Sequence, residues 1–411
     1  MRQSIFATVI VLALFQTGFA QKNDFGKIPK TAKKWLDQMV LIEGKTFIMG
    51  NVDNAIITEA DSMLVAFVVE RRLTAASFYI SKKEVSNLEY RQFCEAMTAK
   101  YGKEAAWQFL PDTLVWGKDF PMGYFTAFET HYHRHPAYDN YPVIGVNWQQ
   151  ANAYCKWASE QLNTSLKAAG KDNFPNFRLP TEVEWESAAL GKPKNTNEAQ
   201  IGERFAWGSS SLRDKKGLIM ANFRNLPDRN GFTDNANVAG SDASITAPVI
   251  SYLPNSHGIH NMSGNVSEWV EDLMRIDIET LLNLEDFDRN RTGAPAVEKR
   301  PKPDYNLMME VYEKSGETAA IDNLFEQLKK MNDSNFPFIG KDPANFKENN
   351  LKPFLADYRR FYHNQGNANI RVVKGGSWWD GPYSLQIGAR QALNENKSSS
   401  RVGFRLAMSK V

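Results

Sequence analysis

The sequence predicts a fold that mixes helices and strands, because strand-like runs alternate with helix-like segments and no internal repeat is visible. Residues 39–50 read as a strand, a glycine turn and a second strand, and residues 78–85 as a further strand. Ser86 and Glu89 have the spacing of a capping box, which opens a helix through about Met97. The composition, 42% hydrophobic and 23% charged, is that of an ordinary globular protein.

Two more helices are expected further along the chain. Residues 149–162 have the apolar spacing of an amphipathic helix. Thr181 and Glu184 repeat the capping-box pattern and start a short helix through about Leu190. The chain contains 10 Trp and 25 Phe, so we expect a core rich in aromatic rings.

One large domain is expected over residues 37–411, after a polar, lysine-rich and flexible lead-in over 21–36. Residues of about 104–142 and 272–368 look like insertions, and the first is rich in aromatic residues, prolines and histidines without a clear period. Long ordered loops in compact domains usually carry binding or another function. The insertions are therefore candidates for a contact surface.

Residues 1–20 have the pattern of a secretory signal peptide. Arg2 gives a positive start, residues 5–15 an apolar run too short to span a membrane, and Gly18 and Ala20 a small-residue cleavage site. An uncleaved anchor is the alternative. No cysteine lies near the cleavage site, so the usual bacterial lipid-attachment residue is absent. We expect an exported protein without a transmembrane segment, periplasmic or held at the outer membrane through partners.

The formal net charge of +2 gives no global field that would favour nucleic acid or an anionic membrane as a partner. Only two cysteines occur, Cys94 and Cys155, each in a helix-like segment. An exported location permits a disulfide between them. Two buried thiols packed as small apolar groups are the alternative, and both remain open at this point.

The chain contains four motifs in order, which are Arg178–Trp185, Asn261–Trp269, Arg371–Asp380 and Gly403–Ala407. Together they resemble the formylglycine-generating-enzyme (sulfatase-modifying factor) family. A single motif of this kind is weak evidence, whereas four in the right order are strong. The resemblance covers about residues 37–272 and 371–408. It implies an irregular α+β fold with much coil and small sheets, distantly like C-type lectins.

The same resemblance indicates what the chain lacks. In the copper-dependent oxidases of the family, two cysteines follow the Gly-Gly-Ser segment, and here those positions are Asp380 and Leu385. Cu(I) prefers soft sulfur ligands, so we expect neither copper nor copper-dependent oxidation of a cysteine substrate. The family's disulfide from the position of Cys155 is also lost, because the matching partner position is Leu406.

Calcium is the ion that the resemblance implies. In relatives, an Asn-x-x-Gly-Asn-x-x-Glu-Trp element binds Ca²⁺ through positions that match the side chains of Asn261 and Glu268 and the backbone carbonyls of Gly264 and Val266. Oxygen ligands of this kind suit a hard cation, and Gly264 permits a tight turn. The alternative is that the polar side chains only hydrogen-bond within a tight loop.

A second calcium site of the family would fall on four other residues. The spacing from Asp242 to the following Ala-Pro-Val segment is one residue shorter than the family pattern, which weakens the match. We therefore treat this site as a separate, weaker prediction. The matching residues are Asn222, Phe223, Asp242 and Ser244.

A short histidine-rich segment is a third candidate for a metal. If the segment is extended, alternation places His131, His133 and His135 on one face. Three imidazoles can hold Zn²⁺. The alternative is a solvated loop before Pro136, because no cysteine or carboxylate pattern nearby completes a site.

A closer resemblance concerns residues 110–116 and 135–148, which look like a Bacteroidetes branch of the family. That branch comprises gliding-motility and type IX secretion lipoproteins, which have this fold without the catalytic cysteines. The resemblance implies a periplasmic assembly attached to the outer membrane. The absent lipid-attachment cysteine is a departure from the branch.

The sequence therefore favours a non-catalytic, calcium-stabilised module of the cell envelope, a component of or accessory to the type IX secretion or gliding-motility apparatus. Its partners would be envelope proteins of that machinery, contacted through aromatic side chains of the first insertion. One alternative is a metal-dependent oxidoreductase with altered chemistry, and another is a lectin-like ligand-binding module. The candidate anchors are Trp107, Trp116, Tyr124 and Phe128.

Overall fold

The computed structural model describes most of the chain outside the two termini and the second insertion. The described residues are 25, 28–52, 70–121, 123, 125–192, 204–224, 245–274 and 369–410. The expected signal peptide over residues 1–20 and nearly all of the second insertion, 275–368, lie outside them. Asp242, Ser244 and Tyr124 also lie outside the described residues.

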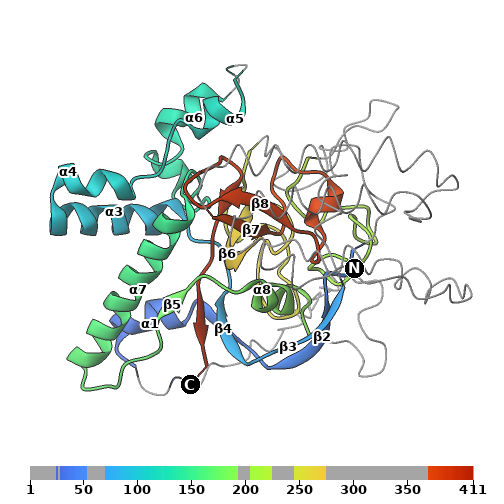
Figure 1. Cartoon of the computed structure of the whole chain (residues 1–411), viewed down its shortest axis with the longest axis horizontal. Helices are drawn as coiled ribbons and strands as arrows, with labels where there is room; N and C mark the ends of the chain where they lie inside the picture. Colours follow the sequence, from blue (N-terminus) through green and yellow to red (C-terminus); the bar gives the residue numbers. More distant parts are fainter. Residues whose placement is uncertain are drawn as a thin grey trace, which may run out of the picture.

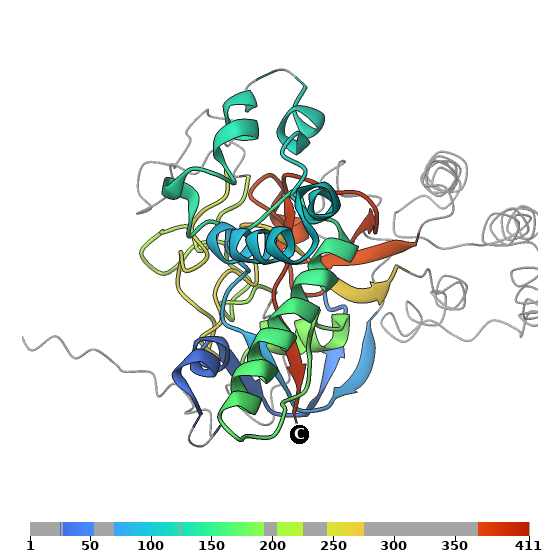
Figure 2. The ribbon, with the colours of Figure 1, turned by 90° about the vertical axis from the view of Figure 1, so that its left-hand side faces the viewer.

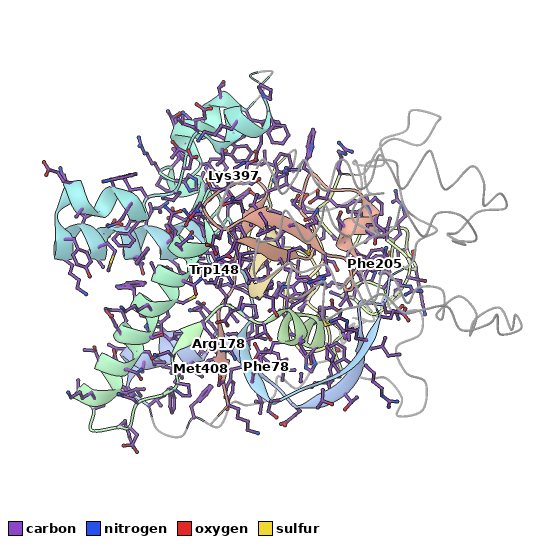
Figure 3. All side chains as sticks on the ribbon, viewed as in Figure 1. Phe78, Trp148, Arg178, Phe205, Lys397 and Met408 are labelled. Carbon is purple, nitrogen blue, oxygen red and sulfur yellow. The ribbon has the colours of Figure 1, made fainter. Side chains whose placement is uncertain are left out.

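A four-stranded antiparallel sheet joins segments from both ends of the chain (Figure 1). Ile80, in its second strand, lies opposite Val40 on one side and Ala407 on the other. Figure 3 shows Phe78, Arg178 and Met408 gathered at this sheet. In spatial order the strands are β1 (Met39–Ile42), β4 (Phe78–Ser81), β10 (Ala407–Ser409) and β5 (Phe177–Arg178).

A second four-stranded sheet carries the two motifs nearest the C-terminus. Glu268 lies opposite Lys374 in an antiparallel pair and beside Gly403 in a parallel pair. A separate two-stranded sheet joins β2 (Lys45–Met49) to β3 (Arg71–Ala75). The order of the four-stranded sheet is β8 (Gln391–Asn394), β7 (Ile370–Lys374), β6 (Ser267–Leu273) and β9 (Val402–Gly403).

Three of the four main helices lie together on one side of the sheets, as Figures 1 and 2 show. They are α1 (Lys30–Leu36), α3 (Asn87–Tyr101) and α7 (Trp148–Ala168). The fourth helix, α8 (Glu182–Ala189), packs against β2 and β6. Mixed helices and small sheets joined by much coil confirm the predicted α+β fold class.

The predicted helix starts are confirmed, and the predicted lengths are less accurate. Capping boxes are present at Ser86 and at Thr181. A third, at Asn147 with Gln150, was not predicted. Both α3 and α7 run longer than expected, and the strand expected over 78–85 ends at Ser81. The strands predicted in 39–50 form, but they pair with β4 and β3 rather than with each other.

The first insertion is a chain of short helical turns rather than an irregular loop. Figure 1 shows α5 and α6 standing away from the sheets, above α3. The proline- and glycine-broken sequence keeps each turn short. The turns are α4 (Lys103–Ala106), η3 (Trp107–Phe109), α5 (Val115–Asp119), α6 (Thr126–His131) and η4 (Pro136–Tyr138).

The main core lies between α3, α7 and the C-terminal strands. The rings of Tyr90 and Tyr154 stack with centroids 5.7 Å apart, and Phe404 meets Tyr154 edge-on at 5.4 Å. Cys94 and Cys155 are buried in this core as free thiols, so the disulfide alternative is wrong. Within the described ranges, no helix combines the length and the apolar character needed to cross a membrane.

Candidate functional site

Three of the four motifs meet at one fully buried carboxylate, that of Glu268 at the start of β6. Arg405 binds it with two hydrogen bonds, Nε to Oε2 at 2.6 Å and Nη2 to Oε1 at 2.5 Å. The indole Nε1 of Trp185 also donates to Oε2, at 2.8 Å. All three side chains are buried, so the ion pair and its hydrogen bonds are protected from water.

A second buried carboxylate, Glu84, lies beside this ion pair. Asn261 donates its Nδ2 to Glu84 Oε2 at 3.1 Å, and Asn265 donates its Nδ2 to Glu84 Oε1 at 2.8 Å. Burial raises the pKa of Glu84 to about 7, the positive charge of Arg405 opposes this rise, and the negative charge of Glu268 adds to it. The site therefore contains two carboxyl groups and one guanidinium.

The loop that presents these groups turns through unusual backbone angles. Asn261, Gly264 and Asn265 have φ values of 56°, 86° and 69°. A Cβ on Gly264 would lie 2.5 Å from the backbone oxygen of Asn222, so no other residue fits without a shift. The same oxygen accepts a hydrogen bond from the N–H of Asn265 at 2.8 Å. Gly264 of the motif is thus required for the backbone geometry of this loop.

The four residues of the first predicted calcium site lie in this loop and the strand that follows. Their donor set of two backbone carbonyls, an amide oxygen and a carboxylate suits Ca²⁺. When Glu84 is ionised, the two carboxylates carry one negative charge more than Arg405 balances, which is compatible with an added cation. However, an ion at Glu268 would share that carboxylate with Arg405 and Trp185. Calcium at this place stays a prediction.

The second predicted calcium site is only partly within the described residues. Asn222 donates its Nδ2 to the Ile245 backbone oxygen at 2.9 Å and to Asn265 Oδ1 at 3.3 Å. Phe223 packs in an apolar cluster with Leu385. Because Asp242 and Ser244 lie outside the described residues, this prediction is also untested.

The two positions that hold cysteines in the oxidases have different surroundings here. Asp380 Oδ2 accepts the backbone N–H of Ser377 at 2.8 Å and its hydroxyl at 2.5 Å, and 14% of the Asp380 side chain is exposed. Leu385, in the turn η7 (Pro382–Leu385), is fully buried against Phe205 and Ile219. These two side chains cannot act together as a soft metal site.

Two arginines flank Asp380. Arg401 places its Nη1 4.0 Å from Asp380 Oδ1, and its side chain is 41% exposed. Arg224 donates its backbone N–H to the Asp380 backbone oxygen at 3.1 Å. Its guanidinium carbon lies 5.2 Å from the ring centroid of Trp379. Sequence reasoning missed this arrangement, because the three segments meet only in the folded chain.

The first insertion packs against the same place. The rings of Phe120 and Trp379 meet edge-on with centroids 4.7 Å apart, and Trp116 lies 5.8 Å from Trp378. Asp119 Oδ2 accepts hydrogen bonds from the backbone N–H and hydroxyl of Ser400, both at 2.7 Å. The insertion is therefore attached to the loop that leads to the C-terminal strands.

The candidate aromatic anchors divide into exposed and buried residues. Trp107 is 70% exposed, whereas Trp116 is fully buried, so the prediction that Trp116 contacts a partner is wrong. Phe128 is half-buried and packs on Trp116 with centroids 5.0 Å apart. The spacing of the aromatic residues in the sequence does not distinguish exposed rings from buried rings, because the two kinds alternate along short helical turns.

The histidine-rich segment does not form the expected extended strand. Residues 126–131 are helical, and a backbone hydrogen bond from His135 to His131 continues the turn. His133 points inward, with its Nδ1 3.1 Å from Asn87 Oδ1, and burial lowers its pKa to about 3. His131 and His135 remain exposed. The three imidazoles therefore do not share a face.

A buried ion-pair cluster on α8 also escaped prediction. Lys374 is fully buried, with its Nζ 2.6 Å from Glu186 Oε1 and 3.6 Å from Glu182 Oε1. Arg390 also pairs with Glu182: its Nε lies 2.7 Å from the same Oε1, and its Nη2 donates to Oε2 at 2.9 Å. The four-residue spacing of Glu182 and Glu186 was a signal for one helix face. Across the described parts of the chain, no group of three or more histidine, cysteine, aspartate or glutamate side chains is placed to hold a metal.

Comparison with known proteins identifies the family. The model of the sulfatase-modifying factor enzyme 1-like domain matches residues 24–410, so the chain belongs to this family. It is similar to the formylglycine-generating enzyme of Streptomyces coelicolor, with 29% identity over 214 residues, 47% of this chain and 57% of that protein. It is also similar to the formylglycine-generating enzyme of Mus musculus, with 27% identity over 264 residues, 58% of each chain.

Another relative is named the inactive Cα-formylglycine-generating enzyme 2 of Bos taurus, with 26% identity over 220 residues, 48% of this chain and 61% of that one. The chain thus spans little more than half the length of these three relatives. Among solved structures, Treponema denticola variable protein 1 gives a TM-score of 0.43 at 17% identity, covering 90% of this chain and 95% of that one. CarF gives 0.43 at 19% identity, covering 91% and 98%.

Proposed function

We propose that this protein is a non-catalytic member of its family that works by binding other proteins of the cell envelope. The observation that carries the proposal is the pair Asp380 and Leu385. Asp380 offers a hard oxygen already bound by Ser377, and Leu385 offers no ligand atom. A soft copper ion has no ligand pair at these positions. The existence of a relative named inactive supports the proposal.

The two thiols of the chain supply no substitute nucleophile. Burial raises the pKa of Cys94 to about 12 and also raises the pKa of Cys155. Both thiols therefore stay protonated near neutral pH, and a protonated thiol is a poor nucleophile and a poor metal ligand. Each lies in the helical core rather than in the loop that contains Asp380.

The partners that we propose are proteins of the type IX secretion or gliding-motility apparatus, contacted by an exported protein in the periplasm or at the outer membrane. The proposal rests on the resemblance of residues 110–116 and 135–148 to that branch. The first insertion supports a contact role, because it exposes Trp107 by 70%, Leu110 by 50% and Leu114 by 54%. Large exposed aromatic side chains are frequent anchors of protein interfaces.

Calcium belongs to the same proposal as a structural ion. Asn261, Gly264, Val266 and Glu268 would hold it, and it would stabilise the loop that precedes β6. Its charge would balance Glu84, which has only amide donors among its hydrogen-bond partners in the described chain. No chemical step is assigned to it.

The decisive experiment measures oxygen consumption by the purified protein with Cu(I) and a cysteine-containing peptide. We expect no thiol-dependent consumption and no stoichiometric Cu(I) binding. The matched control is the double variant Asp380→Cys with Leu385→Cys, which restores both sulfur positions and tests whether the fold can still hold the metal. Turnover by the unaltered protein, or stoichiometric iron, copper or zinc after purification, would instead support the oxidoreductase alternative.

A further inference from the structure

We propose that Arg224 and Arg401, on either side of Asp380, bind a carboxylate group of a partner polypeptide. This inference rests on the proposed non-catalytic function and assigns a ligand class to the place where the oxidases hold copper. The ligand group is a side-chain carboxylate or a C-terminal carboxylate. The fold brings three separate segments together at this place. They contain Arg224, the neighbours Trp379 and Asp380, and Arg401.

Arg224 is a partly buried cation that forms no ion pair with any described residue. Its Nε–H is buried and donates to no hydrogen-bond acceptor. Its guanidinium lies over the Trp379 ring, whose face attracts the cation at 5.2 Å. A guanidinium has five N–H donors and stays charged. Leaving the buried Nε–H without an acceptor is costly, so a ligand that accepts its hydrogen bond is favoured.

Arg401 is paired only loosely. Its nearest carboxylate oxygen is Asp380 Oδ1 at 4.0 Å, beyond hydrogen-bond distance, and its Nε is buried without a hydrogen-bond partner. Asp119 also lies near this loop, but its Oδ2 is taken by Ser399 and Ser400. Among the described residues, Asp119 forms no ion pair with Arg401. The buried Nε–H of Arg401 therefore has no acceptor among the described residues, while 41% of its side chain is exposed.

The local charge selects the ligand. Arg224 and Arg401 carry two positive charges and Asp380 one negative charge, which leaves these three side chains with a net charge of +1. Ser377 holds the Asp380 carboxylate in place with two hydrogen bonds. A singly charged carboxylate balances this charge. A phosphate, with nearly two negative charges at neutral pH, would in addition be repelled by Asp380. The fork of donors on each arginine matches the two oxygens of a carboxylate.

Aromatic rings lie next to Arg224. Trp379 is half-buried and packs on Phe120 of the first insertion at 4.7 Å. The guanidinium of Arg224 lies over the same indole. A polypeptide with an apolar residue next to its carboxylate would contact the rings and the arginines at once. This neighbouring contact favours a polypeptide over a free inorganic anion.

The test uses four small probes on the full chain: acetyl-Gly-Phe with a free C-terminal carboxylate, its C-terminal amide, acetyl-Gly-Asp amide and inorganic phosphate. Binding is followed by the ¹⁵N resonances of the arginine Nε–H groups, assigned with Arg224→Lys and Arg401→Lys. We expect one or both carboxylate probes to shift the two resonances with a dissociation constant in the millimolar range. We expect the amide and phosphate to bind at least tenfold more weakly.

The variants locate the site. Arg224→Gln should weaken carboxylate binding by about tenfold or more, because it removes a charge-assisted hydrogen bond. Arg224→Lys keeps the positive charge and loses the forked pair of donors, so its affinity for the carboxylate should lie between those of the unaltered protein and Arg224→Gln. It replaces Arg224→Gln in the test if the glutamine variant does not fold. Arg72→Gln, on the exposed strand β3, is the matched control and should bind like the unaltered protein.

Several results overturn the inference. They are equal binding of the amide, tighter binding of phosphate than of either carboxylate, no shift of the Arg224 and Arg401 resonances with any probe, or equal weakening by Arg72→Gln. A negative result here leaves the non-catalytic proposal intact, because that proposal is tested by thiol-dependent oxygen consumption. Conversely, turnover in that assay would contradict the proposed function without any measurement on these arginines.

Discussion

Glu268 and Arg405, 137 residues apart in the chain, form a two-point ion pair in the fully buried centre of the molecule. The pair joins β6 to the segment between β9 and β10. Trp185 adds a third hydrogen bond from α8. Because three distant motifs depend on one carboxylate, the pair is a sensitive point for the stability of the whole domain.

We predict that Arg405→Met destabilises the protein by about 3–5 kcal/mol, because removal of one partner leaves a buried, uncompensated charge on Glu268. Urea unfolding followed by tryptophan fluorescence measures this change. Lys33→Met is the control, since Lys33 and Asp37 form an exposed pair and its loss should change stability little. Equal unfolding midpoints for the two variants would contradict the prediction.

His133 predicts a pH dependence. Burial lowers its pKa to about 3 from an ordinary value near 6.5, so the unfolded chain binds a proton that the folded chain refuses. Its contribution to stability is complete above pH 6.5 and is lost as the pH falls toward 3, by about 1.4 kcal/mol per pH unit. His133→Gln should remove this slope.

The comparison with His135→Gln isolates the effect, because His135 is exposed and its replacement should leave the slope unchanged. The measurement is the free energy of unfolding of both variants and of the unaltered protein at several pH values. Parallel curves for His133→Gln and the unaltered protein would mean that His133 is not the group responsible.

Alanine substitutions at two glycines distinguish the cost of backbone strain from the cost of a steric clash. Gly264→Ala should cost more than the roughly 1–2 kcal/mol of a left-handed backbone, because its Cβ would lie 2.5 Å from the Asn222 backbone oxygen. Gly170→Ala has a similar φ of 67° but nothing within 4 Å, so it should cost only the backbone term. Thermal unfolding of both variants gives the difference, and equal losses would show that the loop can yield.

Calcium should raise the midpoint of thermal unfolding if it binds the loop before β6. The increase should follow the calcium concentration as expected for a ligand that binds only the folded state. Asn261→Ala should abolish the increase, whereas Asn163→Ala, which removes two hydrogen bonds with the Phe174 backbone in another part of the fold, should retain it. The same midpoint in calcium, magnesium and a chelator would remove calcium from the proposal.

The two tryptophans of the first insertion should have opposite effects. Trp107→Ala should leave stability nearly unchanged and reduce crosslinking to envelope proteins in the native host, because the side chain is 70% exposed. Trp116→Ala should cost about 3–5 kcal/mol, since it removes a fully buried ring from the cluster around Trp378. Strong destabilisation by Trp107→Ala would place that side chain in the core instead.

Local signals predicted the local structure well. The capping boxes at Ser86 and Thr181 formed as expected, because each needs only a cap and an acid three residues later. The histidine segment failed for the opposite reason. Over so few residues, the alternating histidines are compatible with a strand and with a helical turn. The contact of His133 with Asn87, which is distant in the sequence, favours the helical turn.

The centre of the site was beyond local reasoning. The Asn261–Trp269 motif marked the right loop, but no local pattern joins Glu268 to Arg405 or Glu84 to Asn265. Those contacts join segments that are 137 and 181 residues apart. The two arginines at Asp380 have the same character, because Arg224 and Arg401 reach Asp380 from two distant segments.

The place of β10 has a consequence for how the chain reaches its native state. Residues 407–409 fill the gap between β4 and β5, so the first sheet remains split until this last strand arrives. A chain that has not yet paired residues 407–409 therefore lacks the strand that closes this sheet. Removal of residues 407–409 would leave backbone amide groups of both β4 and β5 without hydrogen-bond partners.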